Sequence, residues 1–211
     1  MRLLSATPSP FARKVRIVLQ EKAIDFELVT EVPWDNDASA PSYNPLGKIP
    51  VLVLDDGTTY YDSTYILEYL EYAHPHPAIL PSDPLERLVH RRFEVLADGL
   101  CDAVVLITIE STRGEAQKSA RWQRRQQNKV EAALEEMDKF HQATQPFTAG
   151  ETFGLADIAL GCALGYLDVR LSTLDWRAKH PELSARFDAL SERSSFRQTV
   201  PKVQTLRDPV V

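Results

Sequence analysis

The hydrophobic pattern of this chain changes its period once, and that change divides the chain into two parts. From Met1 to about Tyr72, short apolar runs of strand length alternate with stretches in which apolar residues recur every three or four positions. After about Leu85 only the helical spacing remains. A chain of 211 residues with 44% hydrophobic content is long enough for two domains with their own cores. The sequence therefore predicts an α/β domain followed by an all-α domain.

The elements expected in the first domain follow a definite order. They are strand, helix, strand, strand, strand and helix, at about residues 2–6, 10–22, 26–31, 51–54, 58–61 and 64–72. The first three form a β-α-β unit, which should be parallel and right-handed. Asp55-Asp56-Gly57 is a strong hairpin signal between the last two strands. This βαβ-ββα order is typical of a thioredoxin-like domain, here residues 1–73.

A proline-rich segment separates the two domains. Residues 74–84 contain four prolines, which stiffen the chain and are typical of a linker. In the second domain, residues 85–211, we expect long helices at about 85–111, 115–140 and 155–171, and a shorter one at 181–193. The helix at 155–171 is apolar almost throughout, so it should be the buried centre of a bundle. The tail from about Pro201 should be frayed or draped over the surface.

Composition and charge exclude several functions. The chain has 30 acidic and 24 basic residues, so its net charge of −6 gives no bulk attraction to nucleic acid or to an anionic membrane. Two cysteines exclude a disulfide scaffold, and the five histidines show no metal-ligand spacing. No apolar run reaches the roughly 20 residues of a membrane span, and the N-terminus lacks the apolar core of a signal peptide. We therefore expect a soluble, cytoplasmic protein without a metal.

Ser9 lies between the first predicted strand and the first predicted helix, and two interpretations fit it. Ser is a preferred N-cap, and the following Pro10 suits the first helical position because its missing N–H would have no partner there. A hydroxyl at a helix N-terminus also lies where the helix dipole and free N–H groups favour an anion. It could donate a hydrogen bond to a thiolate and lower the pKa of that thiol from about 8.5. The tripeptide Ser9-Pro10-Phe11 alone does not separate the two.

Two further motifs combine turn or cap chemistry with possible ligand binding. In the segment from Asn44 to Val51, a cis bond between Ile49 and Pro50 would turn the Ile49 main chain outward, toward an extended peptide ligand. The pair Asp62-Ser63 reads as a helix N-cap. It could also hold a ligand carboxylate on the Ser63 hydroxyl and the helix N–H groups while Asp62 pairs with an ammonium. An α-amino acid head group requires both at once.

Four motifs together resemble the glutathione S-transferase superfamily. They are Ser-Pro-Phe-Ala-Arg-Lys-Val-Arg, Asn-Pro-Leu-Gly-Lys-Ile-Pro-Val-Leu, Asp-Ser-Thr-Tyr-Ile-Leu-Glu-Tyr-Leu and, from Gly154, Gly-Leu-Ala-Asp-Ile-Ala-Leu. The resemblance is to bacterial members and to serine-dependent, tau-like classes, and it covers essentially the whole chain. It implies a glutathione-binding first domain, an all-helical domain that completes the electrophile pocket, glutathione as co-substrate, and a homodimer.

The resemblance also implies roles for the candidate residues. Ser9 would hydrogen-bond the glutathione sulfur. The main chain of Ile49, before Pro50, would pair with the cysteinyl unit. Asp62 and Ser63 would hold the γ-glutamyl head.

Two other candidates keep two interpretations each. Lys48 would meet the glycyl carboxylate or lie solvated on the surface, and Phe11 would pack beside the sulfur or in the core.

Thioredoxin-fold redox enzymes carry Cys at the position of Ser9 and often at that of Ala12, so the sequence excludes dithiol exchange at this site.

The resulting hypothesis is a transferase in which glutathione thiolate attacks a small hydrophobic electrophile, with Ser9 stabilising the thiolate. One alternative is a non-catalytic adaptor that binds a protein partner through the same fold. Another is a glutathione-dependent peroxidase or dehalogenase. The presence of all the binding motifs argues against an adaptor, whereas the sequence does not separate the glutathione-dependent reactions.

Overall fold

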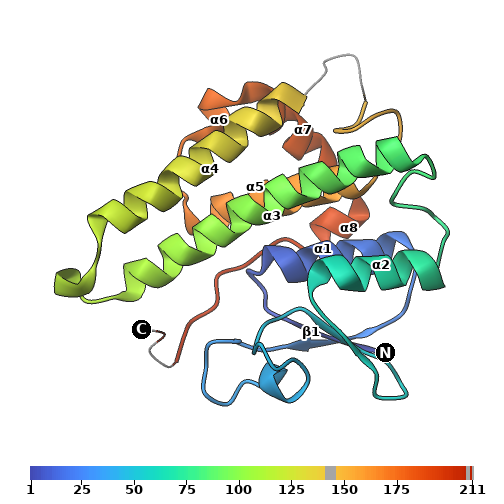
Figure 1. The fold of residues 1–211 in the computed structure, drawn as a ribbon, viewed down its shortest axis with the longest axis horizontal. Coiled ribbons are helices and arrows are strands. Elements are labelled where there is room, and N and C mark those ends of the chain that lie inside the picture. Colours follow the sequence, from blue (N-terminus) through green and yellow to red (C-terminus); the bar gives the residue numbers. More distant parts are fainter. Residues whose placement is uncertain (141–145, 208–209, 211) are drawn as a thin grey trace. The chain divides into compact units, whose positions relative to one another are not determined.

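The structure, a computed structural model, describes residues 1–140, 146–207 and 210, and it consists of two units (Figure 1). The first unit holds residues 1–79 together with the C-terminal segment that starts at Ser194. The second unit is Leu80–Arg193. The sequence did not indicate that the C-terminal segment packs with the first unit.

A mixed four-stranded sheet is the framework of the first unit. Strand β1 (Arg2–Ser5) pairs in parallel with β2 (Glu27–Thr30) and antiparallel with β3 (Val51–Val53). Strand β4 (Thr59–Tyr60) pairs antiparallel with β3, which gives the order β2-β1-β3-β4. The predicted parallel β-α-β unit and the hairpin are therefore confirmed. The hairpin turn contains Gly57 at φ 88°, a left-handed conformation that favours glycine.

Helices α1 (Pro10–Glu21) and α2 (Ser63–Ala73) pack against each other and contact the strands of the sheet (Figure 1). Their buried apolar side chains recur at helical spacing, as at Val15, Val18 and Leu19. The short helix α8 (Ser194–Arg197) packs against α1, although it is far away in the sequence. A single 3-10 turn, η1 (Ala40–Ser42), interrupts the long connection between β2 and β3. These elements form the thioredoxin-like βαβ-ββα domain.

The regular secondary structure in the described residues of the second unit consists of helices. Its elements are α3 (Pro84–Thr112), the 3-10 turn η2 (Glu115–Gln117), α4 (Ala120–Phe140), α5 (Leu155–Arg170), α6 (Trp176–Lys179) and α7 (Pro181–Ser191). Every residue of α5 from Leu155 to Leu167 is buried, and α5 packs against α3 and α7. The predicted central helix is therefore confirmed. None of the helices among the described residues combines the length and the apolar character needed to cross a membrane.

The helix predicted to start near residue 115 starts at Ala120 instead. The carboxylate of Glu110, near the end of α3, accepts hydrogen bonds from the Ser119 main-chain N–H (2.7 Å) and from Nε of Arg113 (3.0 Å). The Ser119 hydroxyl in turn accepts a hydrogen bond from the Trp122 N–H at 3.2 Å. These contacts hold the turn between α3 and α4, and hydrophobic spacing contains no signal for them.

Two buried polar side chains satisfy main-chain groups at the start of α5. The carboxylate of Asp157 is fully buried and accepts hydrogen bonds from the N–H groups of Thr148 (2.7 Å) and Gly154 (3.0 Å). In α3, Nδ1 of His90 accepts from the Ala156 N–H at 3.3 Å. Burial lowers the pKa of His90 below its usual value, which favours the neutral ring that can accept this bond. Three buried N–H groups thus have partners.

A buried ion pair anchors the proline-rich segment to α1. Nζ of Lys22, whose side chain is 0% exposed, lies 2.5 Å from Oε1 of Glu71 in α2. The same ammonium donates hydrogen bonds to the carbonyl oxygens of His74 and Pro77, both at 2.7 Å. Glu71 also accepts from the Ile79 N–H at 3.3 Å. Lys22 therefore holds the chain in place where it leaves the first unit.

Replacing this ammonium should destabilise the protein strongly. We expect Lys22→Met, which keeps most of the side-chain volume, to lower the free energy of unfolding by about 3–5 kcal/mol, because it leaves a buried carboxylate without its counter-charge and two carbonyls without this donor. Urea denaturation measures the change. Lys129→Met, at an exposed position of α4, is the control and should change the stability by about 0.5 kcal/mol or less. Equal stabilities of the two variants would contradict the prediction.

Candidate functional site

The strand register brings the ends of all four strands together at one edge of the sheet. Because β1 and β2 are parallel, their carboxyl ends share this edge. Strand β3 runs antiparallel to β1 with Leu4 opposite Val51, so the start of β3 lies there as well. Strand β4 runs antiparallel to β3 with Tyr60 opposite Leu52, which brings the end of β4 to the same edge. Ligands in open α/β sheets typically bind outside the carboxyl ends of the parallel strands.

The predicted site residues lie beside these strand ends. The loop after β1 carries Ser9, and α1 then begins at Pro10. The residues before β3 are Lys48, Ile49 and Pro50, and those after β4 are Asp62 and Ser63. Ile49 and Tyr61 also pack against the same buried cluster, formed by Leu4, Val51 and Val53. Segments far apart in the sequence thus meet at one edge.

Ser9 is the N-cap of α1, and its hydroxyl keeps a free donor. Its Oγ accepts a hydrogen bond from the Ala12 N–H at 3.2 Å, and Pro10 occupies the first helical position. Within the described residues, the Ser9 O–H group donates to no other atom. Ser9 is half-buried, as is Phe11 in the first turn. The capping interpretation is therefore confirmed, and it leaves the hydroxyl proton available to a ligand.

Asp62 and Ser63 begin α2 in a similar way. Oδ1 of Asp62 accepts hydrogen bonds from the N–H groups of Thr64 (3.0 Å) and Tyr65 (3.4 Å), so Asp62 is the N-cap. Its Oδ2 has no hydrogen-bond partner among the described residues, and the residue is exposed. Ser63 is buried, and its hydroxyl likewise has no partner in the described part of the chain. One carboxylate oxygen and one hydroxyl remain available beside the helix N-terminus.

The segment before β3 presents a main chain and an ammonium. The peptide bond between Ile49 and Pro50 is cis, the isomer that the sequence left undecided. Pro50 is buried, whereas Ile49 is half-buried. Lys48 is exposed, and its ammonium forms no ion pair with a described residue.

Asn44 holds this segment in place, a role that the sequence interpretation missed. Asn44 is buried, and its side-chain amide donates to the Lys48 carbonyl oxygen at 2.8 Å. Its Oδ1 accepts from the Leu46 N–H at 2.9 Å. Gly47 closes the turn at φ 62° and donates its N–H to the Asn44 carbonyl at 2.9 Å. The run Asn-Pro-Leu-Gly carried a signal for it, because Asn side chains bond to the backbone two residues on in such turns.

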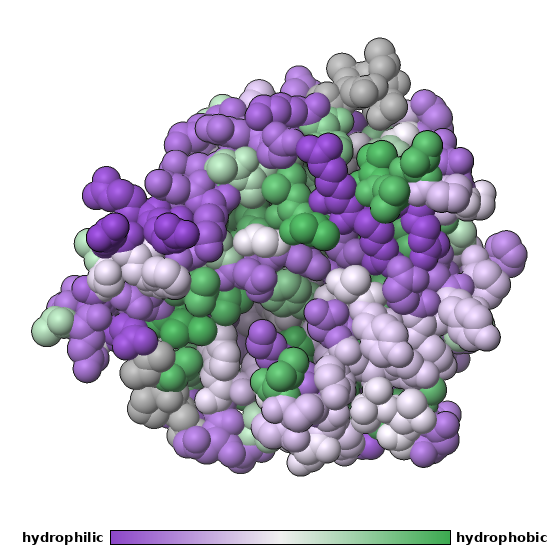
Figure 2. All heavy atoms as spheres, in the orientation of Figure 1, coloured by the Kyte–Doolittle hydropathy of each residue, from purple (hydrophilic) through white to green (hydrophobic). Residues whose placement is uncertain are grey.

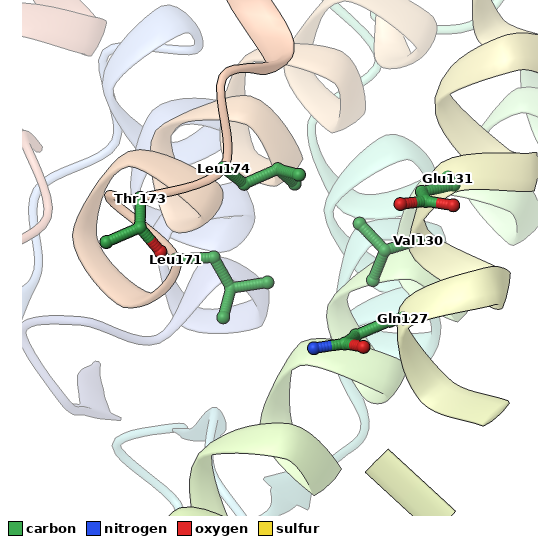
Figure 3. Close-up of a pocket in the computed structure, with 6 residues that line it drawn as sticks. All are labelled: Gln127, Val130, Glu131, Leu171, Thr173 and Leu174. Carbon is green, nitrogen blue, oxygen red and sulfur yellow. The ribbon is translucent and has the colours of Figure 1, made fainter. Parts of the chain in front are cut away.

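Two open pockets lie away from these residues. One, of about 260 Å³, lies within the helical unit, and in Figure 3 Val130 of α4 and Leu171 beyond α5 point toward each other across it. The other, of about 400 Å³, lies at the opposite edge of the sheet, beside Met1 and Gly57. Neither contains a predicted site residue. The described residues include no group of three His, Cys, Asp or Glu side chains placed to hold a metal ion.

Comparisons with known proteins identify the family. The sequence profile of the glutathione S-transferase N-terminal domain matches residues 8–73, and that of the C-terminal domain matches residues 120–185. The uncharacterized GST-like protein YibF of Escherichia coli is 39% identical over 201 residues, which cover 95% of this chain and 98% of YibF. This chain therefore belongs to the glutathione S-transferase family.

Two solved structures are similar over nearly their whole length. A glutathione S-transferase from Methylobacterium radiotolerans, in complex with glutathione sulfonate, is 53% identical, with a TM-score of 0.97 over 100% of this chain and 99% of its own. A glutathione S-transferase from Methylobacillus flagellatus with glutathione bound is 42% identical, with a TM-score of 0.91 over 95% and 99% of the two chains. The electrophile pocket expected in residues 85–211 stays a prediction.

The role of Asn44 can be tested without any ligand. We expect Asn44→Ala to lower the free energy of unfolding by about 1–3 kcal/mol, because the Lys48 carbonyl and the Leu46 N–H lose a buried partner. Hydrogen exchange of the Leu46 amide should become about tenfold faster, which corresponds to about 1.4 kcal/mol. Asn128→Ala, at an exposed position of α4, is the control. Unchanged protection of Leu46 in Asn44→Ala would show that Asn44 does not hold the loop.

Proposed function

We propose that this protein is a glutathione transferase in which Ser9 stabilises the glutathione thiolate during its attack on a small hydrophobic electrophile. The observation that carries the proposal is the Ser9 hydroxyl. This hydroxyl lies at the edge of the sheet where the strand ends meet. Its oxygen caps α1, and its proton is donated to no described residue. A free O–H donor at the positive end of a helix favours an anion. A thiolate is the anion that this site would activate.

The neighbouring groups support glutathione as the source of that thiolate. Glutathione is an extended peptide with an α-amino acid head, and two related proteins were solved with glutathione or its sulfonate bound. In the proposed complex the Ile49 main chain pairs with the cysteinyl unit. The free Oδ2 of Asp62 receives the γ-glutamyl ammonium, and the Ser63 hydroxyl receives its carboxylate. Lys48 meets the glycyl carboxylate.

In this mechanism Ser9 donates a hydrogen bond and need not remove a proton. The glutathione thiol, whose pKa is ordinarily about 8.5, loses its proton to solvent. The Ser9 O–H and the α1 dipole favour the thiolate that remains. The thiolate then forms a carbon–sulfur bond with the electrophile, and the electron pair of the broken bond leaves with the displaced group. Lowering the thiol pKa by two units corresponds to about 2.7 kcal/mol.

Ser9→Ala should separate chemistry from binding. We expect kcat/KM at neutral pH to fall by about 10- to 100-fold, which corresponds to one to two units of thiol pKa. The affinity for S-methylglutathione, which has no ionisable thiol, should change much less when it is measured by calorimetry. Asp83→Ala is a matched control, because Asp83 caps α3 through two hydrogen bonds of 2.9 Å. It should cost about 1 kcal/mol of stability and leave the rate unchanged.

Other results would assign other functions. A folded protein that binds neither glutathione nor S-methylglutathione would favour the adaptor hypothesis. Equal losses of rate and of binding in Ser9→Ala would contradict the thiolate role. Binding of glutathione without transfer to any carbon electrophile, but with turnover of a peroxide or a halogenated substrate, would favour the peroxidase or dehalogenase alternative.

We further propose that the protein is a homodimer. Helix α3 carries a row of exposed apolar side chains on one face, at Leu85, Leu88 and Val95, and Figure 2 shows hydrophobic side chains over this helix. In the first unit, Tyr65 and Tyr72 of α2 are exposed as well. Clustered exposed apolar side chains are typical of protein interfaces. A second copy of this chain is the proposed partner of these helix faces.

Charges on α3 should break such a dimer. The wild-type protein should have twice the chain mass of 23.8 kDa in sedimentation analysis. We expect the double variant Leu88→Glu, Val95→Glu to sediment as a monomer, because two carboxylates would have to be desolvated in the interface. Leu46→Glu, at an exposed position of the first unit, is the control and should stay dimeric. A monomeric wild type, or a dimeric double variant, would contradict the proposal.

A further inference from the structure

The C-terminal segment returns to the loop that carries Ser9. After α8 the chain runs along the first unit, and Figure 1 shows it as the dark red coil beside the start of α1. The Lys202 N–H donates to the Thr7 carbonyl oxygen at 3.3 Å. The Thr7 hydroxyl donates to the Lys202 carbonyl oxygen at 3.0 Å. Thr7 is therefore held from both its main chain and its side chain, two positions before Ser9.

The far end of the segment is fastened by Arg207 to the loop after β2. The Arg207 N–H and its Nε donate to the two oxygens of Asp35, at 3.0 and 2.6 Å. Its Nη2 donates to Asp37 at 2.5 Å. The Asp35 side chain is 0% exposed, so this pair is partly desolvated and stronger than an exposed one. These hydrogen bonds raise the pKa of Arg207, and the guanidinium stays charged at all ordinary pH values.

A third contact lies between these two ends. The Gln204 side-chain amide donates to the Glu31 carbonyl oxygen at 3.3 Å. Glu31 follows β2 directly, and its carboxylate accepts from the N–H groups of Ser39 (2.8 Å) and Ala40 (3.0 Å) at the start of η1. The segment thus bridges the loops that follow β1 and β2. Both loops leave the sheet at the edge where Ser9 and the other site residues gather.

We infer that residues 201–207 form a strap that positions Ser9, and that Arg207 is the positioning residue that fastens it. The inference rests on the proposed function of Ser9. Arg207 acts through the chain: its bonds to Asp35 and Asp37 hold the strap, and the strap holds Thr7. Fastening matters because the direction of the Ser9 O–H depends on the backbone of a short loop, closed by a Ser9 N–H bond to the Ala6 carbonyl at 3.1 Å.

The test loosens the strap at either end. Arg207→Gln removes the ion pair, and Thr7→Val removes the hydroxyl donor while keeping the side-chain shape. Each should raise the pKa of the bound glutathione thiol, which is measured from the ultraviolet absorbance of the thiolate as a function of pH. Each should also lower kcat at neutral pH by about fivefold, the effect of losing roughly one hydrogen bond. The rate should recover at alkaline pH, and the affinity for S-methylglutathione should change by less than about twofold.

Matched controls separate positioning from general stability. Thr7→Ser keeps the hydroxyl and should keep the wild-type thiol pKa. Val203→Ser changes an exposed strap side chain without a polar contact and should have no effect. If Arg207→Gln unfolds, Thr7→Val still tests the strap. A lower melting temperature with an unchanged thiol pKa in these variants would overturn the inference. A wild-type protein that leaves the thiol pKa unshifted would instead overturn the proposed function, and the inference with it.

Discussion

Strand β1 pairs with one parallel and one antiparallel neighbour, and the rest of the first unit depends on this pairing. A parallel neighbour on one side and an antiparallel one on the other bring two strand ends and one strand start to the same edge. The hairpin then adds the end of β4 to that edge. A register shift of one residue would turn each strand's buried side chains to the other face. The burial of Leu4, Val51 and Val53 therefore holds the site segments together as well as the core.

At that edge, the groups that stabilise the fold are also the groups that would bind a ligand. Ser9 and Asp62 each use one oxygen atom to cap a helix, and each keeps another group for a ligand: the hydroxyl proton of Ser9 and Oδ2 of Asp62. This double use explains why neither interpretation of these residues excludes the other. A cap restricts the side chain to one rotamer, and a group that is already restricted loses less entropy when it binds.

Local signals in the sequence predicted most of the architecture. Hydrophobic spacing and turn residues located the strands, the hairpin and the long helices to within a few positions, because these elements depend on neighbouring residues. Errors occurred where a distant side chain decides the local conformation. The start of α4 depends on Glu110 in the preceding helix. The short helix α6 is held by Asp168 of α5, whose carboxylate accepts hydrogen bonds from the side chains of Trp176 and Arg177. Asn44 is part of a turn motif in the sequence, but this motif does not indicate the hydrogen bond from its side chain to the Lys48 carbonyl.

The sequence by itself determined the two-part organisation, the βαβ-ββα order and the residue types at the candidate site, because periodicity, caps and turns are properties of short segments. Only the tertiary structure decided that residues 194–207 belong with the first unit. The bond between Arg207 and Asp35 joins positions 172 residues apart. No local pattern records such a contact, because its formation depends on the path of the whole chain between its two ends.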